Sequence, residues 1–144
     1  MTELSVPHVP SLEQVQGVQA FLAQFEQSDR ETRHHFADGL YAREIVLEAD
    51  DYIVGKLHKT GHLNFLIEGE IEVWAPGQPK KLLRAPMVMP SEAGVKRIGH
   101  AITRVRWVTV HASVETDVAK LEIELIERED IPLLENQYCL EVKE

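Results

Sequence analysis

Hydrophobic residues follow a helical period near the N-terminus and a strand-like pattern over most of the remaining chain. Ser11, with Gln14 three residues later, has the form of a capping box, which marks the start of a helix. Beyond it, apolar residues recur at the spacing of one helix face, at Val15, Val18, Phe21, Leu22 and Phe25. The pattern predicts one amphipathic helix over residues 11–26.

From Tyr41 onward, short runs rich in Val, Ile, Leu and Thr are separated by turn signals. The turns contain Asp, Gly or Pro, as at residues 50–51, 60–61 and 76–77. This spacing is typical of an all-β sandwich or barrel. We expect strands over residues 41–48, 51–57, 62–68, 70–75, 80–84, 87–89, 94–98, 102–112 and 117–127.

The chain of 144 residues, 44% of them hydrophobic, is long enough for one core and too short for two. Residues 1–10 carry two prolines and no periodicity, so we expect an extended N-terminal arm there. The helix and its connection then occupy residues 11–38, the barrel residues 39–128, and a C-terminal packing segment residues 129–144. The pattern over 131–144 fits either a last strand or a packing segment.

Composition excludes several classes of function. The formal net charge of −9 repels a phosphate backbone, so we expect no nucleic-acid partner. Cys139 is the only cysteine, which excludes an intramolecular disulfide and fits a reducing compartment. Because the sequence shows neither a signal-peptide pattern nor an apolar run of membrane-spanning length, we expect a cytoplasmic protein without membrane association. Phosphate-binding glycine loops and a Gly-x-Ser-x-Gly elbow are also missing, which argues against kinase, dehydrogenase and hydrolase functions.

Two segments carry a resemblance to a known family. Residues 65–74 predict a strand, a tight turn at Gly69 and a returning strand, and residues 85–97 predict a strand that runs into a turn at Gly94. These segments resemble the two sequence motifs of the cupins. The resemblance implies an all-β, cupin-like double-stranded β-helix, or jelly-roll barrel, preceded by one short N-terminal helix.

A narrower resemblance is to small single-domain cupin-like proteins of tailed bacteriophages. It rests on residues 39–45, 54–59, 85–86, 94–97 and 107–111. This resemblance implies an accessory protein in the host-cell cytoplasm or in the virion, with virion proteins as partners. The resemblance carries no established activity with it, so it favours a non-enzymatic role without deciding the question.

The metal-binding positions of the cupin motifs are only partly filled. Counted back from Gly69, His62 stands where the cupins have a Glu, and His58 and Lys56 stand where they have a pair of His. Arg97 replaces the His of the second motif. The standard set of three His and one Glu is therefore absent.

Neutral imidazoles are nevertheless good ligands for transition metals. A turn joins the strands that carry His58 and His62, so both rings are able to face one mouth of the barrel. The groups that could complete a ligand set are His100, His111 and Glu44, whose side of its strand the sequence does not fix. We expect either no cofactor or one divalent transition metal, such as Zn, Fe, Ni or Mn. In the alternative interpretation these His only form hydrogen bonds in or around the barrel.

Basic side chains near the same cavity suggest a different ligand. A guanidinium binds a carboxylate or phosphate at two points, and a low dielectric strengthens that contact. The alternative for Lys96 and Arg97 is surface pairing with some of the 24 acidic residues. The residues that we predict to bind a small anionic ligand are Arg43, Lys56, Asn64, Lys96 and Arg97.

Two strands have an unusual arrangement of polar and apolar residues. His62 and Asn64 share one face of their strand, and apolar residues fill the other. If the apolar face packs on the second sheet, His62 and Asn64 face water. In the strand over 102–112 neither face is cleanly polar, so we expect burial by the core on one side and by a partner subunit on the other. A homo-oligomer follows, with a dimer as the first expectation.

Two functions follow from these patterns. The first is a non-enzymatic, phage-type accessory protein whose barrel binds a small anionic ligand or serves as an interaction or virion-associated module. No catalytic residue is assigned in this interpretation. The alternative is a metal-dependent cupin enzyme, an isomerase or oxygenase, that uses His58 and His62.

Overall fold

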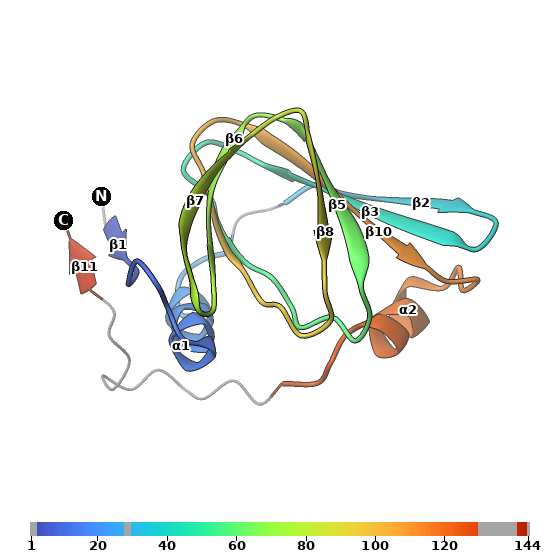
Figure 1. Cartoon of the computed structure of the whole chain (residues 1–144), viewed down its shortest axis with the longest axis horizontal. Coiled ribbons are helices and arrows are strands. Elements are labelled where there is room, and N and C mark those ends of the chain that lie inside the picture. Colours follow the sequence, from blue (N-terminus) through green and yellow to red (C-terminus); the bar gives the residue numbers. More distant parts are fainter. Residues whose placement is uncertain (1–2, 28–29, 130–140, 144) are drawn as a thin grey trace.

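Two antiparallel β-sheets face each other and form a barrel in the computed structural model, which describes residues 3–27, 30–129 and 141–143 (Figure 1). The barrel strands are β2 (Thr32–Ala37), β3 (Leu40–Leu47), β4 (Tyr52–Val54), β5 (His62–Glu68), β6 (Glu70–Ala75), β7 (Gln78–Arg84), β8 (Met87–Ser91), β9 (Ile98–Ala101) and β10 (Val105–Ala112). The five-stranded sheet has the order β2-β3-β10-β5-β8, and the four-stranded sheet has the order β4-β9-β6-β7. The predicted β-barrel with one N-terminal helix is confirmed.

Helix α1 (Leu12–Leu22) begins with the predicted capping box. The Ser11 hydroxyl accepts a hydrogen bond from the Gln14 backbone N–H at 3.1 Å, and the Gln14 side-chain oxygen accepts one from the Ser11 N–H at 2.9 Å. The buried Val15 and Val18 pack against the outer face of the four-stranded sheet. The helix ends earlier than the periodicity predicted.

The strand predicted over residues 117–127 was wrong, because this segment contains the helix α2 (Val118–Leu125). Asp117 caps the helix by accepting hydrogen bonds from two backbone N–H groups of the first turn. Leu121 and Leu125, one helical turn apart, are its buried residues. The mixture of Glu with Ile and Leu that suggested a strand is also satisfied by a helix with one apolar stripe.

β2 lies inside the predicted helix-and-connection segment 11–38 and pairs with β3 along its length. The resulting hairpin extends beyond the barrel (Figure 1). Its turn contains Gly39, whose φ of 73° is easily adopted by glycine. β9 begins at Ile98, where we expected a strand over residues 94–98 to end. Both differences concern short elements bounded by turns.

The two ends of the described chain pair with each other. β1 (Glu3–Ser5) lies in the predicted extended arm and pairs with β11 (Glu141–Lys143) in an antiparallel two-stranded sheet. Residues 130–140, which make up most of the predicted packing segment 129–144 and of the ambiguous tail 131–144, lie outside the described residues. Among the residues that are described, no helix has both the length and the apolar character needed to cross a membrane.

β5 is inverted relative to an ordinary amphipathic strand. His62 and Asn64 are buried, whereas Leu63 and Ile67 between and beyond them are exposed. The arrangement in which the apolar face packs on the second sheet, leaving His62 and Asn64 in water, is therefore wrong. Outward-facing apolar residues form a continuous patch over β10, β5 and β8, here called the outer apolar patch: Leu63, Phe65, Val88, Pro90, Val108 and Val110.

Candidate ligand-binding cavity

A cavity of about 420 Å³ lies between the two sheets. Its polar wall comes from one end of the five-stranded sheet. Tyr41 lies opposite His111 in register, and Arg43 lies opposite Thr109, which in turn lies opposite Asn64. Because residues two apart share a strand face, these side chains and His62 occupy two adjacent layers inside the barrel.

Three imidazole rings meet in this cavity, one from the connection after β4, one from β5 and one from β10. The ring centroids of His58 and His62 are 4.2 Å apart, and each lies 5.0 Å from the centroid of His111. His62 and His111 are buried, and His58 is partly buried. The structure thus brings together the three His that we named as metal ligands.

Burial makes these rings hard to protonate. It lowers the pKa of His58 to about 3, and the two neighbouring rings and two nearby guanidiniums add to the effect. Burial also lowers the pKa of His111 to about 4, with smaller contributions from His62 and Arg43. For His62, burial lowers the pKa more than a backbone hydrogen bond raises it. The cavity therefore contains three neutral imidazoles at pH 7.

Hydrogen bonding fixes the tautomer of one ring. Nδ1 of His62 lies 3.1 Å from the carbonyl oxygen of Thr60, so Nδ1 carries the proton and Nε2 the lone pair. Nδ1 of His111 is buried and has no hydrogen-bond partner in the described part of the chain. Leaving such an atom unpaired costs roughly 1–3 kcal/mol, so it marks a position that a bound ligand would satisfy.

Three guanidinium groups line the same cavity, those of Arg30, Arg43 and Arg97, and the last two lie near the imidazole of His58. Arg43 projects from β3, and Arg97 immediately precedes β9. Arg97 donates a hydrogen bond to the Ser91 hydroxyl at 2.8 Å, and burial lowers its pKa. Neither Arg43 nor Arg97 takes part in any of the ion pairs between described residues. In a chain with 24 acidic residues, two unpaired guanidiniums at one cavity indicate a site for an external anion.

The wall opposite these groups is apolar. Ile53 of β4 and Ile71 and Val73 of β6 line it from the four-stranded sheet. Gly99 lies among them, and a Cβ atom there would lie 2.9 Å from Cδ1 of Ile71 and 3.2 Å from Cγ2 of Ile53. The missing side chain at Gly99 therefore keeps space open between the sheets. The five-stranded sheet thus offers charge and hydrogen bonds, whereas β4, β6 and β9 offer only apolar contact, with Arg97 directly before β9.

Residues 118–129, here called the closing segment, cover one end of the cavity. Leu125 and Ile126 line the cavity, and Ile126 forms an isolated β-bridge with His58. The Glu127 N–H also donates a hydrogen bond to the Leu57 carbonyl at 2.7 Å. Figure 1 shows this part of the chain passing from α2 beneath the barrel in that view. The closing segment thus holds the connection that carries His58.

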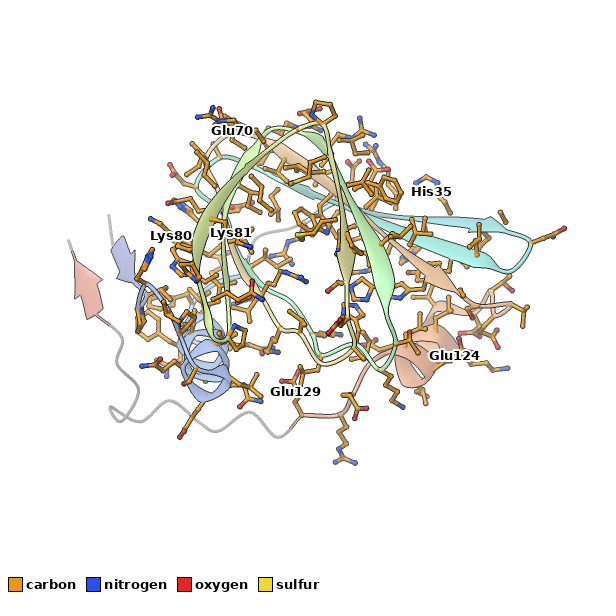
Figure 2. The ribbon with its side chains drawn as sticks, in the orientation of Figure 1. His35, Glu70, Lys80, Lys81, Glu124 and Glu129 are labelled. Atoms are coloured by element: carbon orange, nitrogen blue, oxygen red, sulfur yellow. The ribbon has the colours of Figure 1, made fainter. Side chains whose placement is uncertain are left out.

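Lys96 anchors the closing segment. Its side chain is fully buried, and its Nζ lies 2.8 Å from Glu129. Glu129 also accepts hydrogen bonds from the Gln16 side chain at 3.2 Å and the Leu57 N–H at 3.4 Å. Burial lowers the pKa of Lys96, and the hydrogen bond and charge of Glu129 oppose this. Figure 2 shows Glu129 beneath the lower end of the barrel. Lys96, predicted to bind a ligand, is therefore occupied by an internal ion pair.

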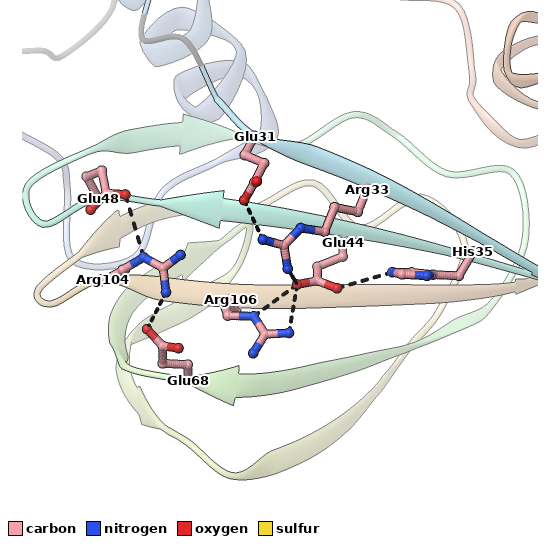
Figure 3. Close-up of polar contacts among 8 residues, drawn as sticks. All are labelled: Glu31, Arg33, His35, Glu44, Glu48, Glu68, Arg104 and Arg106. Atoms are coloured by element: carbon pink, nitrogen blue, oxygen red, sulfur yellow. Dashed lines mark hydrogen bonds and ion pairs between the residues drawn. The ribbon is translucent and has the colours of Figure 1, made fainter.

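Glu44 lies on the other side of β3, away from the imidazoles. Its carboxylate accepts hydrogen bonds from Arg33 at 3.1 Å and Arg106 at 2.9 Å, and it lies 3.2 Å from Nε2 of His35 (Figure 3). Burial raises the pKa of Glu44, but these hydrogen bonds and charges together lower it by more. The pKa of Glu44 therefore lies below its ordinary value. The structure therefore does not bring Glu44 to the predicted metal site.

Asn64 faces the cavity but its hydrogen-bonding capacity is largely used. Its side-chain oxygen accepts hydrogen bonds from the Trp107 indole N–H at 3.1 Å and the Thr109 hydroxyl at 3.3 Å. Its side-chain nitrogen donates to the Met89 carbonyl at 3.4 Å. Asn64 of β5 is thus hydrogen-bonded to both neighbouring strands, β8 and β10, and these bonds fix the orientation of its side chain in the polar wall.

The remaining two candidates, Lys56 and His100, have partners outside the three-His cluster. Lys56 lines the cavity and forms an ion pair with Glu122 of α2, which is also a lining residue. His100 points to the outer face of the four-stranded sheet, where its Nδ1 lies 3.0 Å from the Glu72 carboxylate and its ring stacks on Tyr52. Neither residue is part of the three-His cluster.

Sequence reasoning missed several polar residues of the cavity, among them Tyr41 and His34. The Tyr41 hydroxyl lies 2.7 Å from Nδ1 of His34, and its ring stacks on His111. Burial raises the pKa of Tyr41. Strand alternation supplies the signal for Tyr41, because it lies two residues before the inward-facing Arg43. His34 gave no such signal, because β2 was not predicted.

The three rings have the chemistry of transition-metal ligands, but they are not arranged as a metal site. Rings that share one metal at about 2.1 Å have centroids about 4.5–5.2 Å apart, close to the separations observed. Nevertheless, no group of three or more His, Cys, Asp or Glu among the described residues is arranged to hold a metal ion. As they stand, His58, His62 and His111 are therefore not placed to share one metal ion.

Comparison with solved structures identifies the fold. Ectoine synthase from P. lautus is 16% identical with a TM-score of 0.56, over 80% of this chain and 86% of that chain. A cupin superfamily protein from Desulfitobacterium hafniense is 12% identical with a TM-score of 0.51, over 75% and 97% of the two chains. The cupin domain of Schizosaccharomyces pombe Cnp3 is 17% identical with a TM-score of 0.51, over 72% and 77%.

These identities are low enough that the likeness shows the fold alone. No protein-family model matches the sequence, and no curated protein matches it. The barrel, its two sheets and its structural neighbours nevertheless agree with the resemblance of the two sequence motifs. The chain is a cupin-fold domain.

Proposed function

We propose that this cupin domain binds a small anionic ligand in its cavity and does so without catalysis. The observation that carries the proposal is the pair Arg43 and Arg97, which line the cavity beside three neutral imidazoles and have no carboxylate partner in the described chain. A chain of net charge −9 has ample acidic groups to neutralise them internally. Their unpaired state supports an external anion as the partner.

The cavity supplies what an anion needs. Hydrogen bonds from a guanidinium to an anion are roughly twice as strong as neutral ones, and at the partly buried Arg97, unlike the exposed Arg43, a lower dielectric strengthens them further. His58 and His111, whose tautomers no hydrogen bond in the described chain fixes, can each present an N–H to the same oxygen atoms. The anion would thus be held by two fixed charges and by rings that adjust their protons.

The proposal predicts that each guanidinium contributes at least tenfold to anion affinity, because a charge-assisted hydrogen bond is worth about 1.5–3 kcal/mol. Calorimetric titration with benzoate and with inorganic phosphate should show binding of at least one of them to the unmodified protein. Arg43→Gln and Arg97→Gln should each weaken that binding by a factor of about ten or more.

Arg84→Gln is the matched control, because the Arg84 side chain is 72% exposed and pairs with Glu70 on the surface. It should leave the affinity unchanged. The proposal would be rejected if neither anion bound, or if the two cavity variants bound as well as the control.

The second candidate function is metal binding by His58, His62 and His111. It is favoured by the convergence of three neutral rings and by the His62 Nε2 lone pair, which the Thr60 hydrogen bond leaves available. A bound metal would supply a Lewis acid at the polar wall. Elemental analysis of purified protein and of His58→Ala decides this candidate, since a stoichiometric metal should be present in the first and lost in the second.

The phage-type accessory role, the virion partners and the homodimer remain predictions. Among the described residues, the outer apolar patch supports the homodimer, because exposed apolar residues on β5 and β8, continued by half-buried ones on β10, favour a protein partner. A twofold dimer would bury the same patch on both copies.

A further inference from the structure

The two walls of the cavity differ in a way that defines the ligand beyond its charge. We propose that the ligand is an amphiphilic monocarboxylate, with its carboxylate at Arg43 and Arg97 and an aliphatic or aryl body against the four-stranded sheet. This inference rests on the proposed anion binding. It specifies the uncharged part of the ligand, which the proposed anion binding leaves open.

The polarity of the five-stranded wall changes along the barrel. Tyr41 and Arg43 on β3 are followed two residues later by Ile45, and the next inward position is Leu47. On the paired strand β10, Trp107 lies opposite Ile45. Along β3 and β10, an anion held at Arg43 therefore has apolar side chains beyond it, deeper between the sheets.

Within the strands β4, β6 and β9, the facing wall presents only apolar side chains and glycine backbone to the cavity. Ile53, Ile71 and Val73 line it, and Gly99 adds only backbone. A dianion or a polyhydroxylated ligand would leave its far polar groups without partners there, which is costly in a buried site. An apolar body gains from the same contact, by about threefold to fourfold in affinity for each buried methylene.

Gly99 sets the space that is open to this body. A Cβ atom at this position would lie 2.9 Å from Cδ1 of Ile71, which is too close, so either the isoleucine must move or the cavity must shrink. Because the φ of Gly99 lies outside the left-handed region, an alanine there meets no backbone strain. The position is thus suited to a test of ligand size.

The experiment is calorimetric titration with acetate, butanoate, hexanoate, hexan-1-ol and inorganic phosphate. The unmodified protein should bind hexanoate at least tenfold more tightly than acetate or phosphate, and at least tenfold more tightly than hexan-1-ol. Gly99→Ala should weaken hexanoate binding at least fivefold and acetate binding less than twofold. Ile71→Val, which enlarges the same wall, should retain hexanoate binding, and thermal melting should show that both variants fold.

The outcomes separate this inference from the one on which it rests. The proposed apolar body would be wrong if acetate or phosphate bound as tightly as hexanoate, or if Gly99→Ala left the affinity for hexanoate unchanged. Neither result would contradict the proposed anion binding. If hexan-1-ol bound as tightly as hexanoate, or no carboxylate and no phosphate bound, the proposed anion site would fail as well.

Discussion

Replacing Lys96 with methionine should lower the free energy of unfolding by about 3 kcal/mol, because removing one partner of a buried ion pair leaves the other charge uncompensated. The side chain of Glu129 is 9% exposed and would lose the partner that lies 2.8 Å away. Urea denaturation at pH 7 measures the change. The closing segment should become easier to open, so backbone amides near Leu57 should exchange faster with solvent.

Lys81→Met is the control for this variant, since Lys81 is exposed on β7 and the same change there should cost less than about 0.5 kcal/mol. The double variant Lys96→Met with Glu129→Gln should recover part of the loss, because it removes both charges. Equal stabilities of Lys96→Met and the control would contradict the anchoring role.

Lowering the pH from 7 to 5 should lower the free energy of unfolding by about 2 kcal/mol through His58 and His111 alone. In the folded chain burial holds their pKa values at about 3 and about 4, whereas in the unfolded chain they return to about 6.5. Between these values the unfolded chain binds protons that the folded chain does not, so acid favours unfolding. The estimate of about 1 kcal/mol for each ring allows for solvent near the partly exposed His58.

Urea denaturation at both pH values, with EDTA present to remove metals, measures this effect. The double variant His58→Gln with His111→Gln should lose about 2 kcal/mol less than the unmodified protein over the same pH range. His8→Gln, at an exposed position, should behave like the unmodified protein. An unchanged pH dependence in the double variant would show that these two rings do not carry it.

The sequence predicted the barrel because its strands are short, rich in branched residues and bounded by turns. It failed where a pattern fits two structures. The mixture of Glu with Ile and Leu in residues 118–125 suits a strand or a helix, and the N-cap Asp117 decides for the helix. β2 carries two adjacent His and faces water over much of its length, so it lacked the apolar alternation that identifies a strand.

For the site, the sequence named three imidazoles that the structure brings together, but not the wall they share. His58, His62 and His111 come together because β10 pairs with β5 and the closing segment holds the connection after β4, and these are long-range contacts that spacing does not encode. The sequence also did not predict that Lys96 pairs with Glu129, because this contact too is long-range. The inward face of β5 was the hardest to predict, because a polar inner face contradicts the usual rule and marks a cavity instead of a packed core.

The most direct test of the cavity as an anion site is nitrogen-15 spectroscopy of the histidine rings, recorded between pH 7 and 5 without and with hexanoate. We expect the rings of His58 and His111 to stay unprotonated over this range in the free protein and, together with His62, to shift on addition of hexanoate, while the exposed His35 ring does not respond to the ligand. Cavity rings that titrate near pH 6.5 and show no response to hexanoate would contradict the account.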